Sequence, residues 1–244
     1  MTSGISRRAF LIAALGAPSL VAASHREREL CGVRFRELRG VGKSAARRYL
    51  VIHGDEFTAR DVLTAHLQAT DGFGLVVTGK TRHVTVRGLE LDPNRMYSRI
   101  GAEASLRKLN PEAPDSRILA TLGWLDRRRE KLLRRLTPGE GGRLFALHNN
   151  RNYSIQDEIA ASDAVALNEP DKPRHFFLCT DPRDFSILKG SPYNAVLQTK
   201  AEPDDGSMSR LAARRGFRYV NLECAIDDFE GQMARVRWLE THLA

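Results

Sequence analysis

A histidine and a glutamate follow one of the most apolar segments of the chain at a spacing that suits metal binding. His53 ends the segment Tyr49-Leu50-Val51-Ile52-His53, and Glu56 comes three positions later, after Gly54. If this segment is a buried strand that turns at the glycine into a helix, both side chains project from one turn. An imidazole and a carboxylate so placed can bind zinc, and catalytic zinc sites use three protein ligands. His53 and Glu56 are therefore candidates for two ligands of a zinc site.

Two further segments end in residues that would complete such a site. His148 ends the segment Leu144-Phe145-Ala146-Leu147-His148 and is followed by Asn149 and Asn150, a polar pair that does not suit an enclosed core histidine. Glu223 ends the segment Arg218–Glu223, just before the last helical pattern. Ligands of open α/β sheets bind beyond the carboxyl ends of the strands, so these side chains should meet. His148 is the best candidate for the third ligand, and Glu223 for a general base that later acts as general acid.

Arginines occur near a turn between these segments. Arg87 and Arg95 lie eight positions apart, and Arg95 belongs to the turn-forming sequence Asp92-Pro93-Asn94-Arg95. A guanidinium binds a carboxylate through two hydrogen bonds and also stabilises an oxyanion. This region is therefore a candidate for substrate binding, although Asp-Pro-Asn is also an ordinary turn sequence.

The elements that must position these residues alternate between short apolar strands and longer helical patterns. Strands are expected at Arg48–His53, Phe73–Thr78, His83–Arg87, Arg143–His148, His175–Thr180, Ala195–Thr199 and Tyr219–Glu223. Helices are expected at Thr58–Thr70, Gly101–Leu109, Ser116–Leu136, Met208–Arg215 and Asp228–Leu243. Several strands are apolar on both faces, which indicates a sheet covered by helices on each side. We predict a single α/β domain with a mixed, mostly parallel central sheet.

In this order, the His-x-x-Glu motif, the Asn-Arg pair, the strand-end histidine and the late glutamate resemble the zinc carboxypeptidase superfamily. This superfamily includes carboxypeptidase A-like peptidases and the aspartoacylase and succinylglutamate desuccinylase group. The resemblance spans about Leu50 to Glu223. It implies a zinc carboxypeptidase-like fold and one zinc ion held by His53, Glu56 and His148.

The resemblance also implies roles for the other candidates. Glu223 would be the catalytic base, and Asn94 and Arg95 would hold the substrate carboxylate. Arg87 would stabilise the oxyanion, with Arg82 as the rival for that role. Peptidases of the superfamily carry an active-site tyrosine, for which Tyr193 is the nearest candidate, and Ser207 is expected to line the pocket beside it.

The first 23 residues have the three parts of a signal peptide. Arg7 and Arg8 precede an apolar stretch from Ala9 to Val21, and Ala22-Ala23 ends it. The paired arginines resemble a twin-arginine export signal, so we expect cleavage after Ala23 and a periplasmic or secreted catalytic domain of residues 24–244. The alternative is an N-terminal membrane anchor or a chance apolar start. In the whole chain, no apolar run reaches the roughly 18 residues of a spanning helix.

The charge of the chain does not require a nucleic-acid partner. The formal net charge is +8, of which two charges belong to Arg7 and Arg8. The densest run of cations, Arg127–Arg135, fits the solvated face of a long helix. The three cysteines, Cys31, Cys179 and Cys224, have no Cys-x-x-Cys spacing and are expected to be isolated buried thiols.

These observations together favour an exported zinc hydrolase that cleaves an amide bond next to a free carboxylate. A carboxypeptidase acting on peptides, including cell-wall peptides, is the leading interpretation. A deacylase of N-acyl amino acids of the aspartoacylase type is the alternative, and a non-catalytic binding protein on a degenerate hydrolase scaffold is the second. We expect a monomer.

Overall fold

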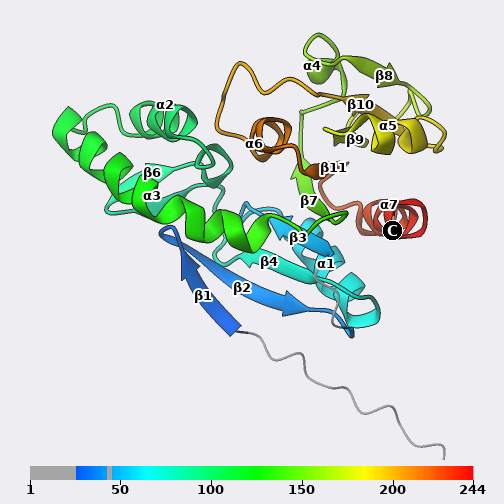
Figure 1. Ribbon diagram of the computed structural model, residues 1–244, viewed down its shortest axis with the longest axis horizontal. Coiled ribbons are helices and arrows are strands. Elements are labelled where there is room, and N and C mark those ends of the chain that lie inside the picture. Colours follow the sequence, from blue (N-terminus) through cyan, green and yellow to red (C-terminus); the bar gives the residue numbers. More distant parts are fainter. Residues whose placement is uncertain (1–25, 43–45, 244) are drawn as a thin grey trace, which may run out of the picture.

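A computed structural model describes residues 26–42 and 46–243, so the expected signal peptide lies outside the described residues. The described chain folds around a nine-stranded sheet (Figure 1). In spatial order its strands are β1 (Arg26–Leu30), β2 (Val33–Arg39), β4 (Phe73–Val77), β3 (Arg47–Val51), β7 (Arg143–Asn150), β11 (Arg218–Ala225), β9 (Phe176–Cys179), β10 (Asn194–Leu197) and β8 (Ala164–Ala166). No helix in this part of the chain is long and apolar enough to cross a membrane.

The centre of the sheet is parallel and its edges are antiparallel. Strands β4, β3, β7 and β11 run parallel to one another, as do β9 and β10. Strands β1, β2 and β8 pair antiparallel with their neighbours, and β11 pairs antiparallel with β9. The predicted mixed α/β sheet is thus confirmed. Its parallel centre brings the carboxyl ends of β3, β7 and β11 to one edge, where a ligand crevice is expected.

Helices cover both faces of the sheet. Buried side chains of α1 (Phe57–Ala69), α5 (Pro182–Leu188) and α7 (Phe229–His242) pack on one face. Those of α2 (Arg99–Leu109), α3 (Asp115–Leu136) and α6 (Met208–Arg215) pack on the other. Side chains alternate along each strand, so Leu50 faces α3 whereas its neighbour Val51 faces α1.

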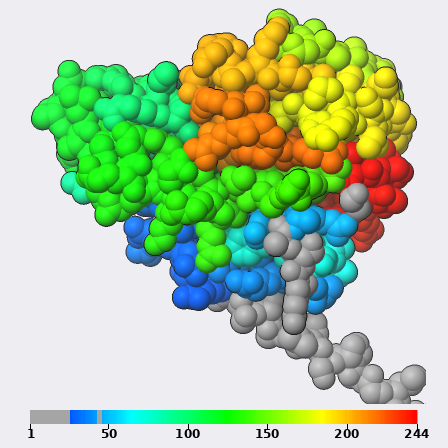
Figure 2. Space-filling model, viewed as in Figure 1, coloured from blue at the N-terminus to red at the C-terminus, as the bar shows by residue number. Residues whose placement is uncertain are grey.

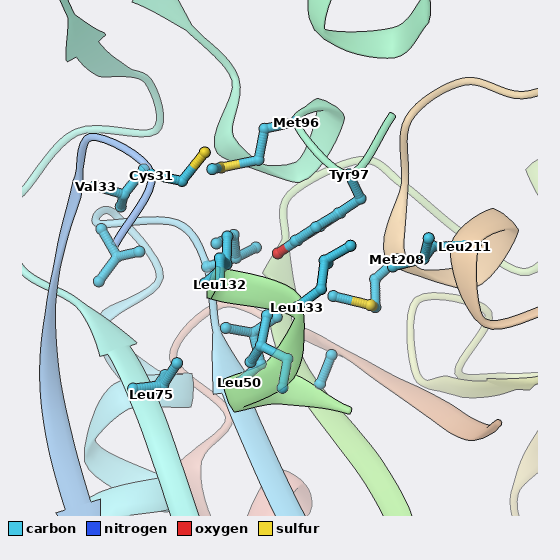
Figure 3. Close-up of a cluster of buried hydrophobic side chains, with 14 of the residues drawn as sticks. Cys31, Val33, Leu50, Leu75, Met96, Tyr97, Leu132, Leu133, Met208 and Leu211 are labelled. Atoms are coloured by element: carbon cyan, nitrogen blue, oxygen red, sulfur yellow. The ribbon is translucent and has the colours of Figure 1, made fainter. Parts of the chain in front are cut away.

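The core on the α3 side connects distant parts of the chain. Figure 3 shows Met96 and Tyr97 beside Leu132 and Leu133 of α3, with Met208 and Leu211 of α6 nearby. On the surface, α6 lies next to the α2–α3 region, and Arg215 forms an ion pair with Glu130 of α3 (Figure 2). This packing holds the segment that precedes α2 against the segment that precedes α6, on the face of the sheet that α3 covers.

Some elements differ from the sequence-based expectation. The hairpin β1–β2 was not predicted, because its charged alternation, as in Arg-Glu-Arg-Glu-Leu, carries a weak apolar signal. The expected strand at His83–Arg87 exists as β5 (Val84–Val86), but it pairs with β6 (Leu89–Leu91) in a separate two-stranded sheet. A 3-10 turn, η1 (Pro93–Arg95), follows β6, and a short α4 (Gln156–Ile159) follows β7. The three cysteines are free and buried, as expected.

Candidate metal centre and active site

His53, Glu56 and His148 meet at the carboxyl edge of the parallel strands. His53 lies just after β3, Glu56 directly before α1, and His148 within β7. One possible ligand atom from each lies within 4.8 Å of the others, and the three residues are 0%, 3% and 4% exposed. The Nδ1 atoms of His53 and His148 lie 2.8 and 3.2 Å from the same oxygen, Oε1 of Glu56. The structure therefore brings together the three residues predicted as zinc ligands.

The turn that places His53 and Glu56 depends on Gly54. Its N–H donates to the carbonyl of Thr81 at 3.0 Å, and an added Cβ would lie 2.6 Å from that oxygen. The guanidinium of Arg60 donates to the carbonyls of Gly54 and Gly79 at 2.6 and 2.9 Å. The segment after β3 and the segment after β4 are thus held so close together that position 54 cannot carry a residue larger than glycine.

The donor set fits a metal ion such as zinc. Imidazole and carboxylate suit zinc, and two ligands each about 2.0–2.1 Å from a tetrahedral ion are about 3.3 Å apart. The separations of 2.8 and 3.2 Å are close to that value. The second oxygen of Glu56, Oε2, is buried and has no hydrogen-bond partner in the described part of the chain. A buried carboxylate oxygen without a partner is costly, and a bound cation would satisfy it.

Asp92 orients the first histidine, a role that the sequence reasoning missed. Its Oδ1 lies 3.0 Å from Nε2 of His53 and also accepts the N–H of Asn94 at 2.9 Å. Metal-binding histidines commonly donate their other ring N–H to a carboxylate, which fixes the tautomer and the ring orientation. The available signal was the position of Asp92 two residues before Asn94, but the sequence alone had indicated only a turn.

The electrostatics of the cluster favour a bound positive charge. Burial lowers the pKa of His53, but the carboxylates of Glu56 and Asp92 outweigh it and raise this pKa to about 9. Burial raises the pKa of Glu56, but His148 and His53 lower it to about 2. Without a metal, His53 therefore holds a proton at neutral pH, and metal binding must displace this proton.

Glu223 lies on the neighbouring strand, directly opposite His148. The two residues are register partners in the parallel pair of β11 and β7. Oε2 of Glu223 accepts from Asn150 Nδ2 at 3.1 Å, and Oε1 accepts from Asn221 Nδ2 at 3.1 Å. The carboxylate is buried and is oriented by two amides, and no ion pair with a cation is found for it among the described residues. This arrangement can accept and return a proton beside the cluster.

A cavity of about 650 Å³ opens over the cluster and contains most of the predicted substrate residues. Asn94, Arg95 and Ser207 line it together with His53, Glu56, His148 and Glu223. Nη1 of Arg95 lies 3.5 Å from Oδ2 of Asp205, so an acid sits beside the predicted carboxylate-binding arginine. Three further arginines line this cavity, namely Arg82, Arg151 and Arg210.

The loop that carries Asp205 and Ser207 is held against η1 and α2 by glycines. Gly206 has φ +80°, and an added Cβ would lie 2.2 Å from the carbonyl oxygen of Arg95. Its carbonyl accepts the N–H of Tyr97 at 3.2 Å. Gly206 also faces Gly101 of α2 so closely that neither can carry a side chain without a backbone shift. The loop and Arg95 are therefore fixed relative to each other.

Two predicted site residues lie elsewhere. Arg87 occupies the exposed β5–β6 turn with φ 53° and does not line the cavity. Its rival Arg82 does line it, with Nη1 3.7 Å from Oε1 of Glu56. The short separate hairpin explains this difference, because it turns Arg87 away at its tip.

Tyr193 likewise does not reach the cavity. Its ring packs on the face of the sheet that α7 covers, against Phe177 and Trp238, with ring centroids 5.7 and 6.2 Å away. Two tyrosines line the cavity, Tyr153 and Tyr219, and the hydroxyl of Tyr153 donates to Glu158. Burial, and then the charge of Glu158, raise the pKa of Tyr153. Tyr153 is therefore a neutral hydrogen-bonding group in the wall of the cavity.

Comparison with known proteins gives similar solved structures but no sequence match. No family model and no curated protein matches the sequence. A “putative metallopeptidase” from Shewanella denitrificans is 12% identical, with a TM-score of 0.44 over 90% of this chain and 84% of that chain. Another from Shewanella baltica is 12% identical, with a TM-score of 0.43 over 89% and 86%.

A third solved structure, a “putative succinylglutamate desuccinylase/aspartoacylase” from Shewanella frigidimarina, is 11% identical. Its TM-score is 0.39 over 90% of this chain and 72% of that chain.

Proposed function

We propose that this protein is a zinc-dependent hydrolase that cleaves an amide bond next to a free carboxylate, as a carboxypeptidase acting on peptides. The observation that carries the proposal is that His53, Glu56 and His148 share one cavity with Glu223, Asn94 and Arg95. A metal-binding set, a carboxylate base and a carboxylate-binding pair are the parts that this reaction needs.

Each part has a defined task. A zinc ion held by His53, Glu56 and His148 would supply Lewis acidity for the attack of water on the carbonyl. Glu223 takes a proton from the attacking water and returns it to the leaving amine, while Asn150 and Asn221 hold its carboxylate in place.

The arginines take the negative charges of the substrate. Arg82, rather than Arg87, stabilises the developing oxyanion, because it lines the cavity at the edge of the ligand cluster. Asn94 and Arg95 bind the carboxylate of the substrate and thereby fix which bond is cleaved. Export through the predicted signal segment would make peptides, including cell-wall peptides, the available substrates.

Metal content tests the proposal first. Protein dialysed without chelator should hold about one zinc per chain, and His148→Ala should lose both the metal and the activity. His175→Ala is the matched control, because His175 is also buried and precedes β9, but it lies outside the cavity. If the wild type holds no metal, or if His148→Ala keeps its metal and activity, the proposal fails.

A substrate comparison then separates the reaction classes. Dipeptides with a free C-terminus, cell-wall peptides and N-acyl amino acids are to be compared by kcat/KM. We expect the peptides to be cleaved and the N-acyl amino acids to be poor substrates. Cleavage of the acyl amino acids alone would assign a deacylase instead.

A further inference from the structure

Three guanidinium groups surround one aromatic ring at the end of the sheet opposite the candidate metal centre, where β3 and β4 begin. The Cζ atoms of Arg48, Arg39 and Arg135 lie 5.0, 5.6 and 5.9 Å from the centroid of the Phe73 ring. Arg39 on β2 and Arg48 on β3 are both register partners of Phe73 on β4, so the three side chains lie in one row on one face. Arg135, in the last turn of α3, reaches the same ring from the helix that covers this face.

The described ion pairs do not balance this charge. Arg135 lies 3.4 Å from Glu37, but that carboxylate already pairs with Arg28 at 2.7 Å. Neither Arg39 nor Arg48 has a carboxylate within 4 Å among the described ion pairs, and Nε of Arg48 is buried with no hydrogen-bond partner there. Burial, and then the charges of Arg135 and Arg39, lower the pKa of Arg48.

Like charges held together around a platform mark a site for an opposite charge. A guanidinium near an aromatic ring is attracted by the ring and can still donate N–H groups to an anion. Guanidinium N–H groups match the oxygens of phosphate or sulfate, which arginine binds through paired hydrogen bonds. We propose that Arg39, Arg48 and Arg135 form a binding site for a tetrahedral oxyanion, either free or as part of a larger phosphorylated molecule.

This site is separate from the candidate metal centre. Arg48 lies near the start of β3 and His53 just after its end, and five residues of extended chain span about 16 Å. Neither Arg39, Arg48 nor Arg135 lines the 650 Å³ cavity. The proposal therefore does not rest on the proposed hydrolase activity.

Calorimetric titration with inorganic phosphate tests the site, at an ionic strength held constant with sodium chloride. We expect saturable binding with about one phosphate per chain, retained after treatment with a chelator, since phosphate can also bind a metal. Arg48→Gln and Arg39→Gln should each weaken binding at least tenfold. Arg39 is exposed, so its variant keeps the test valid if the Arg48 variant fails to fold.

Arg128→Gln is the matched control. Arg128 also lies over an aromatic ring, with Cζ 4.1 Å from the centroid of Trp124 on α3, but away from Phe73. We expect its phosphate affinity to equal that of the wild type. The proposal is overturned if phosphate does not bind saturably, if binding disappears with the chelator, or if Arg39→Gln and Arg128→Gln have equal effects.

Vesicle binding distinguishes the source of the oxyanion. Vesicles of phosphatidylcholine, with and without phosphatidylglycerol, are compared for sedimentation of the protein. Sedimentation only with phosphatidylglycerol, abolished by Arg39→Gln, assigns the site to a lipid headgroup. Saturable phosphate binding without sedimentation assigns it to a soluble phosphorylated ligand.

Discussion

Replacement of Asp92 by asparagine should weaken metal binding about tenfold without removing the site. Oδ1 of Asp92 accepts both from Nε2 of His53 at 3.0 Å and from the N–H of Asn94 at 2.9 Å. The N–H of Asn94 requires an oxygen at this position, so an asparagine should keep its carbonyl oxygen there and retain both hydrogen bonds. The substitution thus removes the charge of Asp92 and leaves the geometry in place.

The magnitude follows from the type of hydrogen bond. A bond to a charged group contributes about 1.5–3 kcal/mol and a neutral one about 0.5–1.5 kcal/mol, so the difference is roughly 1–1.5 kcal/mol. Since about 1.4 kcal/mol is tenfold in affinity, Asp92→Asn should cost about tenfold. Asp92→Ala also leaves the ring N–H of a buried histidine without a partner, and should cost about a hundredfold.

Metal affinity is measured by competition with a chromophoric chelator above pH 9, where His53 carries no proton that competes with the metal, and activity by kcat/KM. Asp181→Asn is the matched control, because Asp181 also precedes a proline, begins a helix and accepts the N–H two residues later, at 2.8 Å from Arg183. Asp181 lies outside the cavity and should leave metal affinity unchanged. If Asp92→Asn binds metal as the wild type does, or if Asp181→Asn loses as much, Asp92 does not position His53.

Three further predictions concern charge. Asp205→Asn should lower KM severalfold with kcat little changed, because Arg95 no longer pairs with a carboxylate that competes with the substrate; an unchanged or higher KM would contradict this. Metal affinity should rise about tenfold per pH unit up to about pH 9, where His53 loses its proton, as measured by metal titration between pH 6 and 9. Burial, and then Arg237 and Arg47, lower the pKa of His66 to about 4, so the unfolded chain binds the proton first as pH falls from 6.5 to 4. The free energy of unfolding should decrease by about 3 kcal/mol over that pH range because of His66. In urea titrations, the His66→Gln variant should lack this decrease. An equal decrease in the variant would refute the prediction.

The sequence was most informative where a strand is buried on both faces. Segments such as Leu50-Val51-Ile52 and Phe176-Phe177-Leu178 are apolar throughout, so their strand character and central position could be read directly. The hairpin β1–β2 lies at the edge, where one face is charged, and the apolar pattern there is too weak to predict a strand. The pairing of β5 with β6 could not be predicted, because a three-residue strand does not specify its partner.

The same contrast between buried strands and exposed segments applies to the residues of the site. His53 and Glu56 follow the buried strand β3, and His148 and Glu223 lie near the ends of β7 and β11. They could be predicted because parallel strands bring their carboxyl ends together. Arg82 and Arg87 lie in a loop and a turn whose course depends on tertiary contacts, such as the close approach of Gly54 to Thr81. Position along the chain therefore could not decide which arginine reaches the cavity.

The two ends of the central strands differ in how their basic charge is balanced. Where the parallel strands end, Arg82 lies within 4 Å of the buried Glu56 and Arg95 within 4 Å of the exposed Asp205, so these two charges are locally balanced. At the opposite end, Arg39, Arg48 and Arg135 surround an aromatic ring, and the nearby carboxylate is already paired with Arg28. Net charge predicts attraction only where it is locally unbalanced. We therefore expect an anionic partner to bind at the end of the sheet opposite the cavity, and a small substrate to be selected in the cavity by the positions of individual groups.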